Sequence, residues 1–255
     1  MGNDASKLLH HNISRKLGIE IIDGEWEAGA SRTLEEIQSR FNVSRTVARE
    51  ASRQLESMGL LRTRRRLGLI AQGMDHWNVL DAQLIDWRLH SKGREAQVHT
   101  LTQLRLAVEP AAAESAARFA SIHTRAQLLP LASEMRRTGE AGQLTEFLAY
   151  DIEFHSLLLR SCGNELFAAL SDVVAVVLQG RTELGLMPAQ PKPEALAGHE
   201  AVAQAVFQGD AKAARLAMEG ILQEVHEAFG EAEEARLESI AQQEALREKE
   251  PDRAE

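Results

Sequence analysis

The stretch of the chain that decides its fold spans residues 39–70 and reads SRFNVSRTVAREASRQLESMGLLRTRRRLGLI. Ser44 is a residue type that caps helices well, and the apolar spacing behind it predicts a helix to Ser57 that Gly59 ends. Two short apolar runs then flank an arginine-rich tip, which is typical of a small β-hairpin. The stretch therefore predicts a helix followed by a basic hairpin, or wing.

Two more helices are predicted on the N-terminal side of this one. Thr33 and Glu36 have the spacing of a capping box for a helix over Leu34–Phe41, and Asn42–Val43 leaves room only for a tight turn. Leu8–Asp23 carries apolar residues on one helical face. A helix, a tight turn and a second helix form a helix-turn-helix, whose second helix enters the major groove of DNA.

Arginine is concentrated in this part of the chain. Over residues 44–66, seven arginines against two glutamates leave a local charge of +5, whereas the whole chain carries −9. The whole-chain charge argues against a nucleic-acid binder, but a basic cluster on an acidic body is typical of a phosphate-binding module joined to another domain. A solvated charged surface is the alternative. Arg45 and Arg49 are the better candidates for reading bases, because guanidinium bonds bidentately to guanine; the hairpin arginines can reach phosphates or the minor groove.

This stretch resembles the winged helix-turn-helix of GntR-type bacterial transcription regulators. The residues that carry the resemblance are Val43–Thr46, Arg49–Ala51, Leu55 and Gly59–Leu60. It implies that operator double-stranded DNA is the partner of this part of the chain. The DNA-binding residues that we predict are Arg32, Ser44, Arg45, Thr46, Arg49, Arg64, Arg65 and Gly68.

The chain departs from the family pattern just before the first helix of the motif. Residues 30–33 replace the usual Leu-Pro-Ser-Glu segment. Glu35 stands where some family members place a DNA-contacting arginine, and Arg32 is a candidate to replace that contact.

The rest of the chain is predicted to be helical almost throughout. Alanine and leucine are plentiful, aromatic residues make up 4% of the chain, and no alternating strand pattern follows the wing. Helices of this length and number are typical of an antiparallel bundle that can hold a ligand in its core. The predicted helices are Trp77–Leu89, Glu95–Ala120, Arg125–Thr138, Leu144–Ser161, Asn164–Leu186, Pro193–Gln208 and Asp210–Gly230.

The predicted fold is therefore mainly α, with an N-terminal winged helix-turn-helix and a C-terminal antiparallel all-α bundle. The predicted domains are residues 1–74 for the winged helix-turn-helix, 75–92 for a connecting helix, 93–230 for an effector-sensing bundle and 231–255 for an acidic tail.

Three polar residues of the bundle form a set that can bind metal. Asp151 and His155 are four residues apart and so share one face of a helix, and His199 lies near the start of another helix. Such a set suits Zn²⁺, Ni²⁺ or Mn²⁺. By spacing alone, an Asp–His pair of this kind is more often a surface hydrogen bond.

A second resemblance bears on this set. The residues that carry it are Leu104–Pro110, Asp151, Phe154–His155, Cys162–Asn164, His199–Val202 and Gly209–Asp210, and they resemble the ligand-sensing helical (FCD) domain of the FadR-like branch. The resemblance implies a divalent ion held by Asp151, His155 and His199, with Ile221 at the position of the family's last histidine. His226 lies about 140° further round the helix and is a poor substitute. We expect either three ligands completed by water or effector oxygens, or a hydrogen-bonded polar core.

The same resemblance points to an acidic effector. Arg105 matches the arginine that meets the effector's carboxylate, the alternative being a pair with Glu109 within one helix. Arg181 is a second anion-binding candidate, for which Glu183 or solvent is the alternative partner. The segment from Trp77 resembles the domain connection of galactonate-responsive regulators, which implies a sugar acid, with a hydroxy acid such as lactate next.

We therefore predict a homodimeric DNA-binding repressor that a small organic acid releases from its operator. A metal-dependent hydrolase or isomerase using Asp151, His155 and His199 is the alternative, disfavoured because no separate general base can be named near them. A purely helical scaffold would leave the arginine-rich wing unexplained. We expect a cytoplasmic protein without membrane contact, because Cys162 is the single cysteine and the longest strongly apolar run, Val173–Leu178, is far too short to cross a bilayer.

Overall fold

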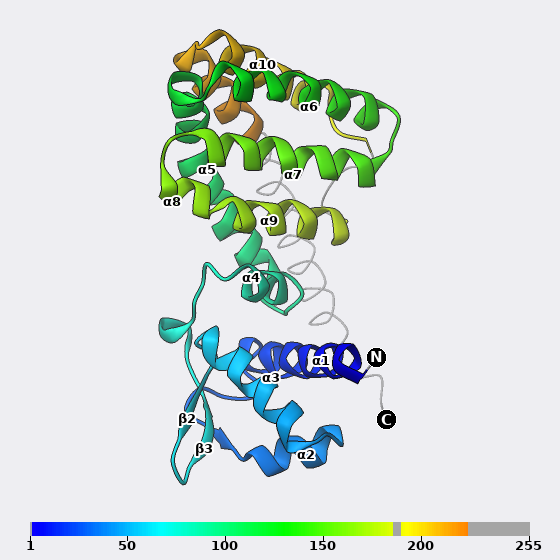
Figure 1. Ribbon diagram of the computed structural model, residues 1–255, viewed down its shortest axis with the longest axis vertical. Coiled ribbons are helices and arrows are strands. Elements are labelled where there is room, and N and C mark those ends of the chain that lie inside the picture. The colour runs from blue at the N-terminus through cyan, green and yellow to red at the C-terminus, as the bar shows by residue number, and fades with distance from the viewer. Residues whose placement is uncertain (1, 186–189, 224–255) are drawn as a thin grey trace, which may run out of the picture. The chain divides into compact units, whose positions relative to one another are not determined.

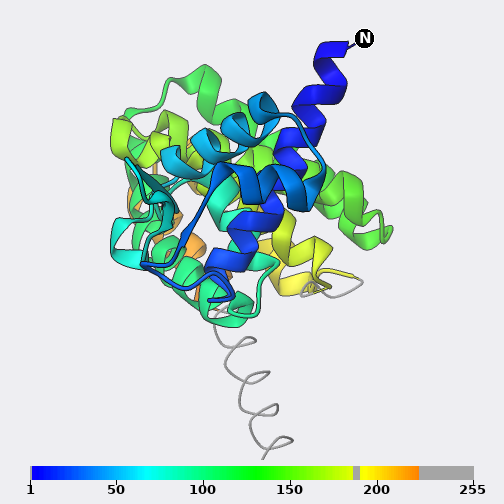
Figure 2. The same ribbon diagram turned by 90° about the horizontal axis from the view of Figure 1, so that it is seen from below.

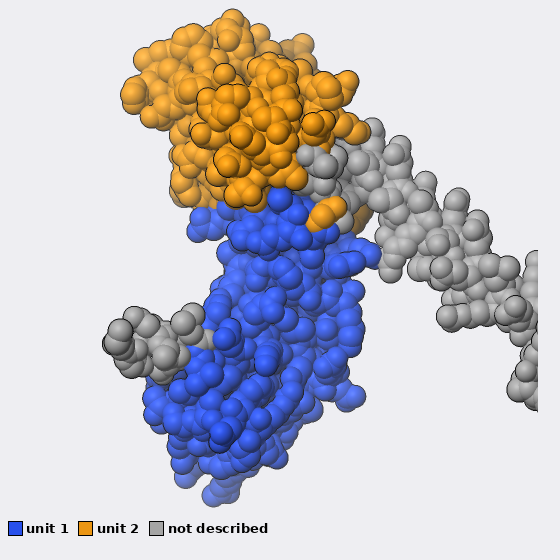
Figure 3. Space-filling model, turned by 90° about the vertical axis from the view of Figure 1, so that its right-hand side faces the viewer, with its two compact units in different colours: residues 1–98, 172–184 blue, residues 99–171, 185–255 orange. Residues whose placement is uncertain are grey.

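The computed structural model describes residues 2–185 and 190–223, and it is mainly helical, as the sequence predicts (Figure 1). Contacts within the chain divide it into two compact units, one made of residues 1–98 with 172–184 and the other of residues 99–171 with 185–255 (Figure 3). The predicted acidic tail, residues 231–255, lies outside the described residues. None of the helices in the described ranges is long and apolar enough to cross a membrane.

The first unit begins with the predicted winged helix-turn-helix. Its three strands form one antiparallel sheet in the order β1-β3-β2, in which Leu61 faces Ala71 and Arg64 faces Gly68. The hairpin is as predicted, but β1 was not expected because it is only two residues long and pairs with β3 from a distance in the sequence. The elements are α1 (Gly2–Ile22), β1 (Ser31–Arg32), α2 (Leu34–Phe41), α3 (Arg45–Ser57), β2 (Leu61–Arg64) and β3 (Gly68–Ala71).

Local capping explains why α2 and α3 begin where they do. The Thr33 hydroxyl accepts from the backbone N–H of Glu36 at 3.1 Å, and the Glu36 carboxylate accepts from the N–H of Thr33 at 2.6 Å. This confirms the capping box. Asn42 adopts a left-handed conformation (φ 51°) that ends α2, and Ser44 then accepts from the N–H of Val47 at 3.3 Å.

The core of this unit lies between α1, α3 and the sheet. α1 packs along α3, and the two blue helices lie together in Figures 1 and 2. α1 also contacts α4 (Ala82–Leu89). Leu17, Leu55 and Trp87 are fully or almost fully buried there. A side chain on Gly18 would collide with the ring of Trp87, so the close packing of α1 against α4 requires glycine at this position.

The connection between the wing and the bundle is less helical than predicted. A helix was expected from Trp77, but only a short 3₁₀ turn, η1 (Met74–His76), precedes it and α4 begins at Ala82. Asp81 sets this start, because its carboxylate accepts from the N–H groups of Gln83 at 2.9 Å and Leu84 at 3.0 Å. Trp77 itself is extended.

The second unit is built from long helices. α6, α7 and α10 lie side by side, with α7 and α10 on either side of α6 (Figure 1). Residues 211–223 continue as a further helix within the described range, where a helix was predicted. The helices of this unit are α5 (Arg94–Phe119), of which residues 94–98 fall in the first unit, α6 (Ile122–Glu140), α7 (Leu144–Ser161), α8 (Glu165–Ala169) and α10 (Pro193–Gln208). The remaining helix, α9 (Ser171–Glu183), belongs to the first unit from residue 172 on.

One predicted helix proves to be two. A single helix was expected from Asn164 to Leu186, but the chain ends α8 at Ala169 and starts α9 at Ser171. The Ser171 hydroxyl donates to the carbonyl of Ala168 at 2.8 Å, a local hydrogen bond that competes with the helical pattern. α9 then falls in the same compact unit as the winged helix-turn-helix.

Candidate functional site

The first candidate surface is the exposed face of α3. Val47 and Leu55 are buried on one side of the helix, whereas Arg45, Thr46 and Arg49 are exposed on the other. The local sequence therefore turns a basic, hydrogen-bonding face outward, which is the geometry that a recognition helix requires.

Glu35 faces this surface from α2. Its Oε1 lies 3.8 Å from a guanidinium nitrogen of Arg45, and both side chains are about two-thirds exposed. The acidic residue that departs from the family pattern is therefore within ion-pair distance of a predicted base-reading arginine. Its charge opposes the approach of a phosphate to Arg45.

The hairpin lies beside α3 and is tied to it. The Glu56 carboxylate accepts from the backbone N–H of Thr63 at 2.7 Å, so the start of the wing is held against the end of the recognition helix. Arg64 and Arg65 are exposed, and among the described residues neither forms an ion pair. A groove of about 350 Å³ separates helix and hairpin and is lined by Leu34, Arg49, Ser52, Arg53, Glu56, Thr63, Gly68 and Leu69.

Gly68 has a structural reason to be glycine. Its φ is +85°, and a Cβ there would lie 2.6 Å from the carbonyl oxygen of Arg32. Only glycine fits where β3 passes β1 this closely. Gly68 therefore serves the predicted DNA surface by allowing the backbone of the wing to take its shape.

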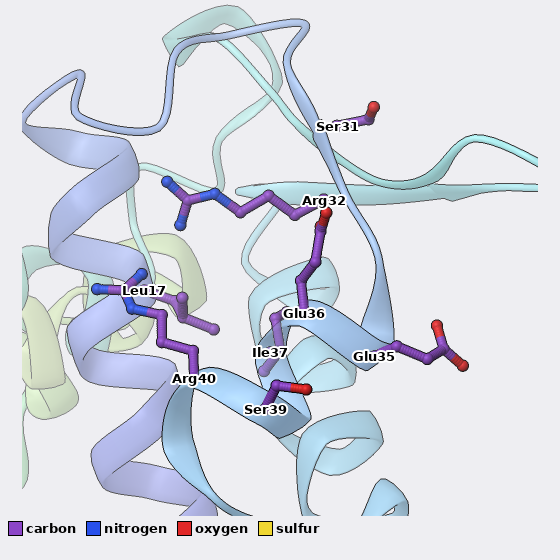
Figure 4. Close-up of a pocket in the computed structure, with 8 residues that line it drawn as sticks. All are labelled: Leu17, Ser31, Arg32, Glu35, Glu36, Ile37, Ser39 and Arg40. Atoms are coloured by element: carbon purple, nitrogen blue, oxygen red, sulfur yellow. The ribbon is translucent and has the colours of Figure 1, made fainter.

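The Arg32 side chain is engaged inside the domain. Its guanidinium donates to Glu20 at 2.8 Å and lies over the ring of Trp26, 4.4 Å from the centroid. Arg40 donates to the same carboxylate, and Figure 4 shows Arg32 and Arg40 pointing toward α1 while Glu35 points away. Burial alone would raise the pKa of Glu20, but the hydrogen bonds from the two arginines lower it. The DNA contact predicted for Arg32 therefore requires its guanidinium to leave these partners.

The second candidate site is buried in the helical unit. Asp151 and His155 of α7 and His199 of α10 are each at most 5% exposed. Asp151 Oδ1 lies 3.2 Å from His155 Nε2 and 3.5 Å from His199 Nε2, and the two Nε2 atoms are 3.4 Å apart. The structure thus brings together the three residues that the sequence singled out, and we call them the cation triangle.

The outer nitrogens of both imidazoles face acceptors. His199 Nδ1 lies 2.7 Å from the carbonyl oxygen of Ala195, and His155 Nδ1 lies 2.5 Å from Oε2 of Glu109 on α5. The contact between His155 and Glu109 is close, but it is not a well-aligned hydrogen bond. With a proton on each Nδ1, both Nε2 lone pairs are directed into the triangle. Metal-ligating histidines are oriented in this way by carbonyl and carboxylate partners.

The spacing of the triangle fits a small divalent ion. Ligands held 2.0–2.1 Å from a tetrahedral ion stand about 3.3–3.4 Å apart, close to all three distances. Asp151 Oδ1 also makes no well-aligned hydrogen bond within the described part of the chain. A buried carboxylate oxygen without a donor is unusual, and a bound cation would satisfy it.

The charges around the triangle also favour a bound cation. Burial disfavours the charged form of His155, yet Glu109 and Asp151 raise its pKa to about 9. Burial likewise opposes ionisation of the carboxyl groups of Glu109 and Asp151. Arg105 and His155 nevertheless lower the pKa of Glu109 to about 2. His155 and His199 hold the pKa of Asp151 well below its usual range. Two buried carboxylates therefore need positive charge beyond Arg105, which either a proton on His155 or a divalent cation can supply.

Arg105 forms the ion pair that was the alternative to effector binding. Its Nε donates to Oε1 of Glu109 at 2.5 Å, and both side chains are 2% exposed. Burial lowers the pKa of Arg105, and the charge of Glu109 more than offsets this. Arg181 is also buried, but it lies on α9 in the other compact unit.

Glu109 is the member of the site that sequence reasoning missed. The sequence marks Glu109 only as a partner of Arg105 within one helix, whereas in the structure it contacts both Arg105 and His155. The available signal was its place four residues after an arginine on a helix otherwise rich in alanine. That signal does not reveal the contact with α7, which depends on how the helices pack.

The position of the family's fourth ligand is apolar here. The side chain of Ile221 is buried, and its Cγ1 would lie 2.7 Å from a Cβ built on Gly198, the residue before His199. Ile221 therefore packs against the backbone of α10 and supplies no ligand.

Comparisons with known proteins agree with this organisation. The model of the bacterial regulatory proteins of the gntR family matches residues 9–70, and the FCD domain model matches residues 100–224. An uncharacterized HTH-type transcriptional regulator of Escherichia coli K12, YieP, is 26% identical over 86% of this chain and 94% of its own length. The galactonate operon transcriptional repressor of the same organism is 28% identical over 79% of this chain and 88% of its own length.

Solved structures show the same fold. Escherichia coli McbR/YncC superposes with a TM-score of 0.50 at 14% identity, covering 88% of this chain and 98% of its own. Listeria monocytogenes Lar superposes with a TM-score of 0.50 at 15% identity, covering 87% of this chain and 96% of its own. At these identities the likeness concerns the fold alone.

Proposed function

The chain belongs to the gntR family of bacterial regulatory proteins and carries an FCD domain behind its winged helix, and from this premise we propose that it represses an operator until a small sugar acid binds the FCD domain. It is a DNA-binding transcription regulator and not an enzyme, so the hydrolase alternative is set aside. The galactonate operon repressor, similar over 79% of the chain, is the observation that favours repression and a sugar acid.

The DNA-binding part of the proposal rests on α3 and the wing. Arg45 and Arg49 lie exposed on one face of α3, and Arg64 and Arg65 are exposed on the adjoining hairpin. In this arrangement the helix reads bases in the major groove while the wing contacts phosphates. We propose that a homodimer places two such modules on the halves of a pseudo-palindrome, as two-fold symmetry requires.

The effector part of the proposal rests on the buried polar residues of the FCD domain. A divalent ion at the cation triangle would attract an effector carboxylate or hydroxyl, because three protein ligands leave coordination positions for oxygen atoms. Arg105 is the anion partner that the resemblance implies, and its release from Glu109 would let it meet a carboxylate bidentately.

A route from the FCD domain to the recognition helix supports regulation by an effector. α9 lies within the FCD match, yet it packs on α4, where a Cβ on Gly180 would be 2.6 Å from Leu89. α4 in turn meets α3 through a hydrogen bond from the Gln54 amide to the Gln83 side chain. A shift of α9 would therefore act on α3 through one intervening helix.

The experiment that tests this function is a gel shift with DNA from the promoter region next to the gene. We expect retardation at physiological salt that survives excess unrelated DNA, and release by galactonate or a related aldonate at millimolar concentration. Absence of specific retardation would contradict the regulator assignment for this operator. Specific retardation that no aldonate or hydroxy acid relieves would contradict the proposed effector class alone.

A further inference from the structure

A second group of metal-ligating side chains occurs on α4 and α9, made of residues other than those of the cation triangle. Asp86 lies on α4, His90 is the residue that caps the C-terminus of this helix, and Glu183 belongs to the last turn of α9. One ligand atom of each residue lies within 4.8 Å of the other two. All three residues belong to the first compact unit.

His90 lies between the two carboxylates, which face different nitrogens of its ring. His90 Nδ1 lies 2.8 Å from the carbonyl oxygen of Asp86 and 3.3 Å from its Oδ1, and His90 Nε2 lies 3.8 Å from Oε2 of Glu183. With the proton on Nδ1, the Nε2 lone pair is free on the side of Glu183, and the Asp86 carboxylate must turn from Nδ1 to join a cation bound there. Gln179 donates to the other oxygen of Glu183 at 2.8 Å, which directs Oε2 toward the histidine.

The backbone that carries these residues is held in register by packing. Gly180 lets α9 approach Leu89 so closely that a Cβ would lie 2.6 Å from its Cδ1. His90 directly follows Leu89, and Glu183 comes three residues after Gly180 on the same face of α9. The contact that joins the helices therefore also places the imidazole beside the carboxylate.

The charge of the group favours a cation. With a neutral imidazole the three side chains carry −2, and across the described ranges neither Asp86 nor Glu183 forms an ion pair with a lysine or arginine. One imidazole and two carboxylates form a borderline ligand set, which suits Zn²⁺ and its neighbours Mn²⁺, Co²⁺ and Ni²⁺. The side chains of His90, Asp86 and Glu183 are 26%, 40% and 45% exposed, respectively, so water can enter and complete the coordination.

We propose that Asp86, His90 and Glu183 bind one divalent cation of the zinc class, which pins α9 to α4. This site is independent of the cation triangle and of the proposed effector. A cation there would hold together two helices that come from different parts of the chain, because two ligands come from α4 and its C-cap and one comes from α9. Its occupancy would therefore change how firmly α9 is attached to the connection that leads to the winged helix.

Zinc stoichiometry tests the proposal. Tag-free, chelator-stripped full-length protein carrying His155→Ala and His199→Ala is titrated with Zn²⁺ against a chromophoric chelator. We expect one equivalent to remain bound, and a further His90→Ala or Glu183→Gln change to weaken it at least about tenfold, since each removes one of three ligands. His76→Ala is the matched control, because His76 also lies beside a carboxylate, that of Asp75 at 3.0 Å, and is well exposed.

A second measurement covers the case in which the double variant does not fold. In the wild-type background, His90→Ala should lower zinc stoichiometry by one equivalent, and zinc should slow amide exchange in α9 of the wild type but not of the Glu183→Gln variant. If no zinc remains after the triangle is removed in a folded protein, the proposal is overturned. It is also overturned if His90→Ala, Glu183→Gln and His76→Ala bind zinc alike.

Discussion

Glu109 Oε2 lies 2.5 Å from Nδ1 of His155, a buried contact between α5 and α7. Through this one carboxylate, the arginine predicted to meet the effector and the histidine predicted to bind metal share a partner. An anion that draws Arg105 away from Glu109 would therefore alter the electrostatic surroundings of His155. The two halves of the proposed effector site are physically coupled.

Glu109→Gln should weaken divalent metal binding at the cation triangle without removing a ligand. The amide keeps the shape of the carboxylate but loses the charge that orients and supports His155, and such outer partners are worth about 10- to 100-fold in metal affinity. Chelator competition with zinc measures the change. Glu114→Gln on the same helix, where Glu114 pairs with Arg118 and Arg215 near the surface, should leave the affinity unaltered.

His155→Ala should abolish tight metal binding at the triangle, blunt the effector response and spare operator binding. The substitution removes a ligand inside the FCD domain and touches no residue of the DNA surface. The shift of the unfolding temperature with zinc, with and without a chelator, measures metal binding, and gel shifts measure operator binding. His123→Ala, which changes an exposed histidine of α6, is the control. An unchanged effector response in His155→Ala would show that the site is assigned wrongly.

Arg49→Ala should weaken operator binding by about 1–3 kcal/mol, or one to two orders of magnitude, because one guanidinium contact to a base edge is worth that much. Effector binding should be unchanged. Fluorescence anisotropy with labelled operator and competitor DNA measures both the loss and the specificity ratio. Arg137→Ala removes an equal charge from α6 and should have no comparable effect. Equal losses in the two variants would mean that net charge, and not α3, determines binding.

Glu35→Gln should strengthen DNA binding by about 1.4- to 5-fold, because exposed charge pairs of this kind are worth about 0.2–1 kcal/mol. The change frees Arg45, 3.8 Å away, and removes a negative charge from the DNA-facing side. The gain should shrink as salt rises, since the effect is electrostatic. Glu146→Gln changes the net charge equally on α7 and should not alter affinity; a gain there of the same size would contradict the local explanation.

Gly18→Ala should destabilise the first unit by about 1–3 kcal/mol, because the added methyl group must push against the ring of Trp87 in a filled core. Gly220→Ala offers the opposite case. It lies in a helix with nothing within 4 Å of the added Cβ, so it should be neutral or stabilise by up to about 1 kcal/mol. Thermal unfolding, monitored by circular dichroism, compares the unfolding temperatures of the two variants. Equal changes of the unfolding temperature in both variants would contradict the packing argument.

Much of this molecule could be predicted from sequence because its signals are local. Thr33 with Glu36 and Ser44 with Val47 make their capping bonds within three residues, and α2 and α3 begin where these caps place them. Two of the differences also have local causes, because the Asp81 cap that starts α4 and the Ser171 hydroxyl at the break before α9 both act within three residues. Apolar periodicity runs through both positions and hides these signals. Only β1 depends on pairing with a strand far along the chain.

The sequence by itself determined the family, the order of most helices, the basic face of α3 and the three residues of the cation triangle. Periodicity, caps and charge are properties of short segments, so they can be read before the chain folds. Tertiary structure alone decided that Glu109 joins Arg105 to His155, that Arg32 is held by Glu20 and Trp26, and that Glu183 meets His90. These relationships arise when helices pack at one register, and no local pattern encodes the register between two helices.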